Sequence, residues 1–136
     1  MYSSATRALA TLEPATLEND PLDLVHLERQ TLGDRDLQRE LLALFVTQSP
    51  SLVARMRALG DGEPAAFADL AHHLKGSALA IGAVGVAALA TGLEEAARRE
   101  AEGLEAPETR KPATRDLAGL EAALAAAIVA IDALLI

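Results

Sequence analysis

A segment in the middle of the chain places a histidine, a lysine and a glycine on one side of a predicted helix. At about 100° per residue, its apolar side chains form one stripe made of Phe67, Leu70, Leu74, Ala78 and Ile81. His72 points away from that stripe, and Lys75, Gly76 and Leu79 follow at i+3, i+4 and i+7. The small residues upstream on the same face are Ala65 and Ala68. The pattern predicts an imidazole accessible to a macromolecule.

This arrangement suits a reactive side chain that a partner molecule can reach, with the ammonium of Lys75 beside it. Gly76 leaves room for a partner, at a cost of about 1 kcal/mol of helix propensity relative to Ala. An isolated exposed histidine on a helix is usually only a solvated residue, so the lysine and glycine in register carry the interpretation.

The second histidine of the pair, His73, is predicted at the edge of the apolar stripe, where a partner would reach it poorly. Neighbouring helical residues diverge by about 100°, and no third ligand lies near in sequence, so a metal held by His72 and His73 is disfavoured. His26, upstream, is expected to be an ordinary surface or half-buried helix residue. His72 is therefore the expected reactive group.

The elements that position His72 are separated by proline and glycine. Pro21 is expected to open a short helix capped by Asp20, and Gly33 to stop it before Asp34 caps the next. A long helix follows over 35–59, with a kink expected near Ser49 because of a proline at position 50. The helix of His72 is then expected from Pro64, capped by Asp61 or Glu63, to Gly82.

Two further helices are expected after Gly82. The first covers 84–102, with an inward row of Val86, Leu89, Leu93 and Ala97 and an outward row of Glu94, Glu95, Arg98, Arg99 and Glu100. A loop over 103–112 separates it from a last helix over 113–134. The predicted fold is all-α, an antiparallel four-helix bundle with a short additional N-terminal helix. It occupies 21–136, after a flexible N-terminal leader over 1–20.

Composition excludes several classes of function. The chain of 136 residues is 51% apolar and 2% aromatic, and its formal charge of −8 disfavours nucleic acid as a partner. It contains no cysteine, so disulfides, thiol nucleophiles and cysteine-ligated zinc are excluded. The first residues lack the charged-then-apolar pattern of a signal peptide, and no apolar run is expected to reach the roughly 20 residues of a membrane span. We expect a cytoplasmic protein without a membrane partner, and a monomer.

The central motif resembles the signature of histidine-containing phosphotransfer (Hpt) domains. That signature reads His, any residue, Leu, Lys, Gly, often Ser, with Gly-Ala shortly after, and is matched here by Ala71-His72-His73-Leu74-Lys75-Gly76-Ser77 and Gly82-Ala83. Weaker likenesses are Leu32-Gly33-Asp34, Phe45 and Leu93-Glu94, so the resemblance extends over about 20–134. Where the family often has Thr or Ser, this chain has His73.

The resemblance implies a phosphoryl carrier of a two-component phosphorelay, without kinase activity of its own. Its phosphorylated residue maps to His72, with Lys75 near the phosphoryl group and Gly76 allowing partner access. The implied partners are receiver domains of hybrid histidine kinases and response regulators, which supply Mg²⁺, so no cofactor or metal site is expected in this chain. The receiver is expected to dock on Leu79, Ala68 and Ala65, together with the neighbouring long helix or the short first helix.

Two other functions stay open from the sequence. The chain could be an Hpt-like adaptor that binds a kinase or receiver domain without being phosphorylated, although His72, Lys75 and Gly76 argue against it. It could also be the phosphorylated module of a chemotaxis-type kinase, but it carries no Gly-rich nucleotide loop. A carrier is the preferred interpretation.

Overall fold

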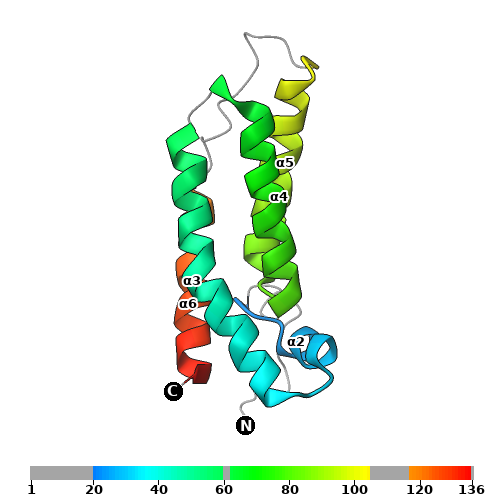
Figure 1. The fold of residues 1–136 in the computed structure, drawn as a ribbon, viewed down its shortest axis with the longest axis vertical. Helices are drawn as coiled ribbons and strands as arrows, with labels where there is room; N and C mark the ends of the chain where they lie inside the picture. Colours follow the sequence, from blue (N-terminus) through cyan, green and yellow to red (C-terminus); the bar gives the residue numbers. More distant parts are fainter. Residues whose placement is uncertain (1–19, 60–61, 105–116, 136) are drawn as a thin grey trace.

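The computed structural model describes residues 20–59, 62–104 and 117–135, and their regular structure is helical throughout (Figure 1). The helices are α2 (Leu24–Thr31), α3 (Arg35–Leu59), α4 (Pro64–Ile81), α5 (Val84–Ala101) and α6 (Leu117–Leu135). The all-α prediction is confirmed. The predicted leader, most of the loop over 103–112 and the start of the last helix at position 113 lie outside the described residues.

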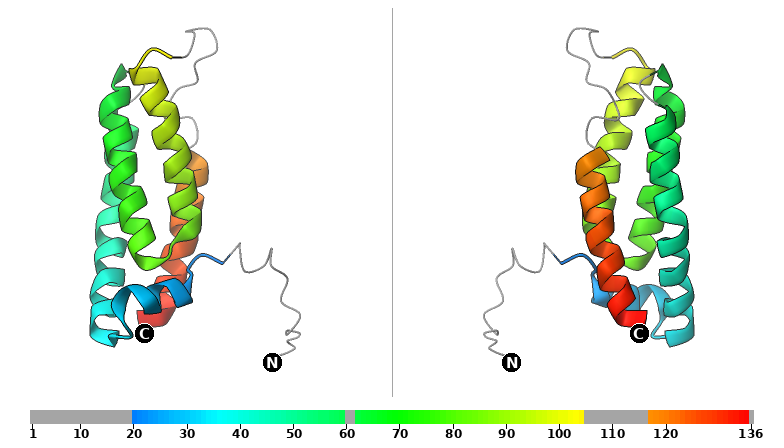
Figure 2. Two further views of the ribbon diagram at one scale, coloured as in Figure 1. Left: turned by 90° about the vertical axis from the view of Figure 1, so that its right-hand side faces the viewer. Right: turned by 90° about the vertical axis from the view of Figure 1, so that its left-hand side faces the viewer.

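The helices α3, α4, α5 and α6 stand side by side, and α2 lies across one end of them (Figures 1 and 2). The helix α4 packs against α3 and α5, and α6 packs against the same two helices from the other side. The order around the bundle is therefore α3, α4, α5, α6, which makes α4 and α6 diagonal neighbours. The predicted four-helix bundle with a short additional helix is confirmed.

The short helix α2 begins later than predicted. Asp23, not Asp20, occupies the N-cap, and its Oδ1 accepts the backbone N–H of His26 at 3.0 Å. The reason is that residues 20–23 form a non-helical segment that docks on the bundle: Leu22 is buried, and the N–H of Asp23 donates to the carbonyl oxygen of Gly82 at 2.7 Å. At the other end, Leu32 and Gly33 both have positive φ, and Asp34 caps α3 as predicted.

Gly82 stops α4 and also receives that docked segment. Its φ of 79° lies in the left-handed region that favours glycine. A Cβ added to Gly82 would lie 2.6 Å from the backbone oxygen of Asp23, so any larger residue would displace the segment before α2. The predicted stop at Gly82 is confirmed, and the structure adds that this glycine joins two distant parts of the chain.

The helix α3 runs without interruption through Pro50. Proline removes one backbone hydrogen bond and crowds the preceding turn, and Figure 1 shows that α3 changes direction along its length. The predicted bend is therefore accommodated within one helix, whose buried side chains continue on both sides of Pro50, from Phe45 to Met56.

The pair α4 and α5 makes the most extensive helix contact among the described residues. Both helices bury alanines along their length: Ala68, Ala71 and Ala78 on α4, and Ala87, Ala90 and Ala97 on α5. Small side chains at a helix contact allow the two axes to approach closely. This close approach brings polar side chains of α5 within reach of the outward face of α4.

The last helix, α6, is a longer continuous apolar segment than the sequence interpretation expected. Of the described helices, α6 is long and apolar enough, by length and composition, to cross a membrane, so the expectation that no such segment exists is wrong. The core helix of a soluble bundle passes the same test. The helix buries Leu117, Leu120, Leu124, Ala127 and Ile131 against the bundle.

Candidate functional site

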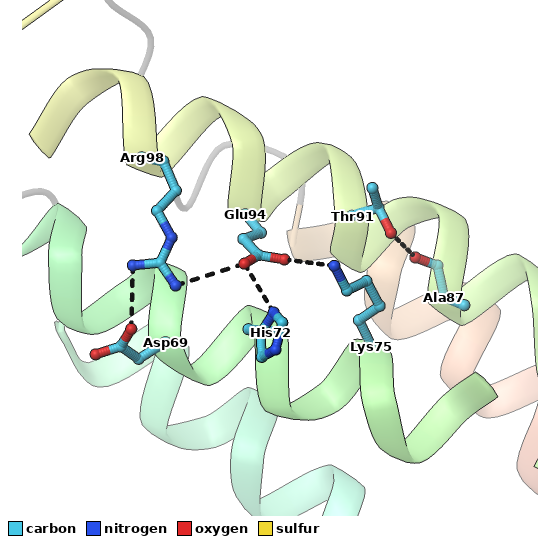
Figure 3. Close-up of polar contacts among 7 residues, drawn as sticks. All are labelled: Asp69, His72, Lys75, Ala87, Thr91, Glu94 and Arg98. Carbon is cyan, nitrogen blue, oxygen red and sulfur yellow. Dashed lines mark hydrogen bonds and ion pairs between the residues drawn. The ribbon is translucent and has the colours of Figure 1, made fainter. Parts of the chain in front are cut away.

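The imidazole of His72 lies on the exposed surface of α4 and contacts a carboxylate of α5 (Figure 3). Its Nδ1 lies 2.9 Å from Oε2 of Glu94, while 63% of the His72 side chain remains exposed. Glu94 itself is only 12% exposed, because it lies in the groove between the two helices. One side of the ring is therefore held and the other faces solvent.

Two cations share the same carboxylate with His72. Nζ of Lys75 lies 3.0 Å from Oε1 of Glu94, and the Arg98 guanidinium lies 3.4 Å from Oε2. Arg98 also reaches Oδ1 of Asp69 at 3.1 Å, which links α5 back to α4 one turn before His72. Figure 3 shows Lys75 and Arg98 on either side of Glu94. With a neutral ring, the four formal charges sum to zero.

These contacts lower the pKa of Glu94. Burial by itself disfavours the carboxylate and would raise its pKa. The hydrogen bonds from Lys75 and His72 outweigh that effect, and the pKa lies below its ordinary value of 4.5. Glu94 is therefore ionised at neutral pH and can only accept hydrogen bonds.

An ionised Glu94 decides which ring nitrogen of His72 carries the proton. A carboxylate accepts, so the nitrogen that faces it, Nδ1, must donate and hold the proton. In a neutral imidazole the other nitrogen, Nε2, then keeps its lone pair. Among the described residues, no contact is assigned to Nε2. The nucleophilic nitrogen is thus the one that faces solvent.

Most of the predicted site residues lie where the sequence placed them. Gly76 is exposed, and a Cβ added to it would meet nothing within 4 Å, so the surface beside His72 is open. Leu79 is 48% exposed, and its carbonyl oxygen lies 2.6 Å from Nε2 of His26, which joins α2 to the same face. Ala65 is exposed. His26 is half-buried, as expected.

Ala68 does not belong to this exposed face. It is fully buried, so the expectation that it contributes to a docking surface is wrong. Its position along the sequence predicts only the direction in which Ala68 points from the axis of α4. The close packing of neighbouring helices on α4, above all of α5, buries Ala68.

His73 is exposed too, contrary to the expectation that a partner would reach it poorly. One and two turns further along α4, Ser77 and Ala80 line a small cavity shared with α3, so His73 faces the α3 side of the helix. Exposure therefore does not distinguish the two histidines. What distinguishes them is that His72 contacts the half-buried carboxylate of Glu94, which Lys75 also contacts, on the α5 side.

Glu94 is the site residue that the sequence interpretation missed. The sequence predicts it among solvated side chains on the outer face of its helix, yet its side chain is only 12% exposed and contacts His72, Lys75 and Arg98. Glu100, placed in the same outward row, is buried as well. The only signal for Glu94 in the sequence was its place in the weaker Leu93-Glu94 likeness.

The charged side chains around His72 do not form a metal site. In the part of the chain that the structure describes, no group of three or more His, Cys, Asp and Glu side chains is placed to hold a metal ion. The carboxylate of Glu94 is already bound by cations of the protein.

Comparisons with known proteins agree with this geometry. The family model of the Hpt domain matches residues 40–134, which is 95 of the 136 residues. The match includes α4, α5, most of α3 and all but the last residue of α6, whereas α2 lies outside it. Neither the curated proteins nor the solved structures contain a significant match to the chain.

Proposed function

The chain belongs to the Hpt domain family, and on that premise we propose that it carries a phosphoryl group on His72 between aspartates of receiver domains. Hpt domains serve histidine phosphotransfer in two-component signalling as phosphocarrier modules. The observation that carries the proposal for this chain is the hydrogen bond between Nδ1 of His72 and Glu94, because it leaves Nε2 exposed with its lone pair.

In the proposed reaction, Nε2 of His72 attacks the phosphorus of an aspartyl phosphate. A nitrogen–phosphorus bond forms, the bond from phosphorus to the aspartate oxygen breaks, and the aspartate leaves as a carboxylate. No proton has to leave the ring, since Nε2 carries none and Nδ1 keeps its own. The ring therefore gains positive charge, which the adjacent carboxylate of Glu94 stabilises. Transfer to the next receiver reverses these steps.

Lys75 is proposed to face the phosphoryl oxygens. In the structure its ammonium is paired with Glu94, so this role requires the flexible lysine side chain to turn towards Nε2. The charges around His72 already balance, and a phosphoryl group adds about two negative charges near neutral pH. We propose that the Mg²⁺ of the receiver domain supplies the rest of the neutralisation, with no cofactor in this chain and no kinase activity of its own.

The proposed docking face extends along α4 on both sides of His72, from Ala65 at the start of the helix to Leu79 at the end nearest α2. It consists of Gly76, Leu79 and Ala65, without Ala68. The contact between His26 and the Leu79 carbonyl joins α2 to the lower part of this face, so α2 can take part in docking. We place the reaction in the cytoplasm, with receiver domains of hybrid histidine kinases and response regulators as partners.

The test is phosphoryl transfer from a phosphorylated receiver domain in the presence of Mg²⁺. Wild type and His73→Gln should take up label that is acid-labile and stable in alkali, whereas His72→Gln should take up none. The two histidines are both exposed, so His73→Gln is a matched control. Label that is lost only in His73→Gln would move the site to the α3 side. No label on the wild type from several receivers would favour the adaptor function.

A further inference from the structure

A second exposed surface lies on the opposite side of the bundle from His72. The outer face of α6 is made of exposed small or apolar residues and one exposed carboxylate: Ala118, Gly119, Ala122, Ala125, Ala126, Val129, Asp132 and Ala133. Val129 is the most prominent of them, since 70% of it is exposed. Because α6 is the diagonal neighbour of α4, a molecule that binds this face leaves His72 accessible.

An open apolar groove of about 310 Å³ continues this face towards α3. Its apolar lining is Pro50, Val53, Ala54, Leu124, Ala125 and Ile128. One rim of the groove is formed by Arg57 and Glu121, whose side chains pair at 2.7 Å. Ala125 belongs to both the groove and the outer face of α6, so the two form one continuous apolar surface.

The surface is almost uncharged on a chain that is strongly acidic. The whole chain has a formal charge of −8, but the helix α6 contains only two ionisable side chains, Glu121 and Asp132. Glu121 is turned towards α3 by its pair with Arg57. Two copies of an acidic protein repel each other wherever their carboxylates meet. On this face they can approach with almost no such repulsion.

The same charges argue against other occupants. Helices that lie on a membrane surface carry Lys and Arg on their polar face, and α6 has neither. A receiver domain must reach His72, which lies on the α4–α5 side. We propose that the outer face of α6 is an interface between two copies of this chain, related by a two-fold axis, in a weak dimer that leaves both His72 side chains exposed.

The residue pattern of α6 fits an antiparallel two-fold contact. With the axis between Ala125 and Ala126, the large Val129 of one copy lies against the small Ala122 of the partner subunit, and the reverse contact is identical. Asp132 then lies opposite Gly119 of the partner subunit, so no carboxylate of α6 meets another. Small residues allow the two helices to pack closely.

The contact is limited in size. At 1.5 Å per residue, the 19 residues of α6 are about 28 Å long, and one helix pair of that length gives an interface at the small end of the range. We therefore expect dimerisation to depend on concentration, with dissociation on the order of 10–100 μM. The expectation of a monomer would then hold in dilute solution.

The experiment is sedimentation velocity on the full chain over a range of concentrations. The wild type should shift from monomer to dimer as concentration rises. Val129→Glu should remain a monomer, and so should Ala122→Lys. The matched control is Leu104→Glu, which adds the same charge at a residue that is 67% exposed and lies outside α6, and it should dimerise like wild type. Circular dichroism checks that each variant is folded.

The double variant Ala122→Lys, Val129→Glu tests the register. In the antiparallel arrangement each lysine faces a glutamate of the partner subunit, so the double variant should recover the dimer. Dimers of Val129→Glu as strong as wild type, or no recovery in the double variant, would overturn the proposal. A wild type that is monomeric throughout, including one that binds lipid vesicles through α6, would overturn it too. Phosphoryl uptake by Val129→Glu should equal that of wild type, so this outcome is separate from the proposed carrier function.

Discussion

The α4–α5 side and the α6 side of this bundle use opposite chemistry on similar helices. On the α4–α5 side, Asp69, His72, Lys75, Glu94 and Arg98 form one connected polar network. On the α6 side, small apolar residues form an exposed face whose only charged group besides the paired Glu121 is Asp132. Both sides depend on small side chains.

The difference shows that small residues serve two purposes in this chain. Between α4 and α5 the alanines are buried, and the close helix contact places a carboxylate beside the imidazole. Along α6 many alanines are exposed and have no partner helix among the described residues. The first arrangement positions the imidazole of His72, and the second leaves a surface that another helix can cover.

Among these predictions, the largest expected effect is on phosphoryl transfer, and it comes from removing the carboxylate of Glu94 on the α4–α5 side. Glu94→Ala removes the acceptor of Nδ1 and the negative charge beside the ring, so the ring is no longer oriented. We expect the rate of phosphoryl uptake by His72 to fall roughly tenfold to a hundredfold. The measurement is single-turnover transfer from a phosphorylated receiver domain.

The control for that change is Glu95→Ala, on the same helix. Glu95 is exposed, so its loss should leave the rate close to that of wild type. Equal rates for Glu94→Ala and wild type would show that the carboxylate only joins the helices.

A smaller effect on the transfer rate is expected when one glycine is replaced on the α4–α5 side, and none when one is replaced on the α6 side. Gly76 and Gly119 both lie within helices, with nothing within 4 Å of an added Cβ. Gly76→Gln should slow transfer severalfold by obstructing the receiver, whereas Gly119→Gln should not. Each should raise the free energy of unfolding by about 0.5–1 kcal/mol, because glycine is a poor helix former.

Thermal unfolding of both glycine variants separates access from stability. Slower transfer by a stable Gly76→Gln protein supports obstruction of the docking face. If both variants transfer phosphate at the wild-type rate, His72 is approached from another direction.

Acid should modestly reduce the stability that Glu94 contributes on the α4–α5 side. The pKa of Glu94 is lowered on folding, so its stabilising contribution is complete above the ordinary value of 4.5 and is lost as pH falls through the lowered pKa. Glu94→Gln lacks this contribution. The difference in unfolding free energy between the two proteins should therefore shrink as pH falls below 4.5. Denaturant titrations at several pH values measure it, and a constant difference would contradict it.

The smallest effect on transfer and stability is expected from removing the ion pair between Arg57 and Glu121, on the α6 side. Arg57 and Glu121 are both well exposed, and pairs of exposed ions add little to stability. Arg57→Ala should leave phosphoryl transfer unchanged and hardly alter the melting temperature. A marked loss of transfer would mean that the two sides of the bundle are coupled.

Much of the fold and part of the site could be predicted from local sequence. The helix of His72 and its end at Gly82 followed from apolar spacing and from a residue that favours positive φ. The start of α2 could not be predicted in this way, because Asp23 is fixed by a hydrogen bond to Gly82, some sixty residues further along the chain. Ala68 and His73 were misjudged because one helix considered alone does not show which neighbour covers it.

The sequence by itself determined the bundle, the exposed position of His72 and its neighbours on the same helix. These features depend on spacing within one helix, where residues three and four positions apart always meet. Only the tertiary structure decided the partner of His72. Glu94 lies on another helix, and its role depends on how closely α5 packs against α4. The distance between α4 and α5 depends on how their two surfaces pack together. It cannot be predicted from the residue spacing within either helix alone.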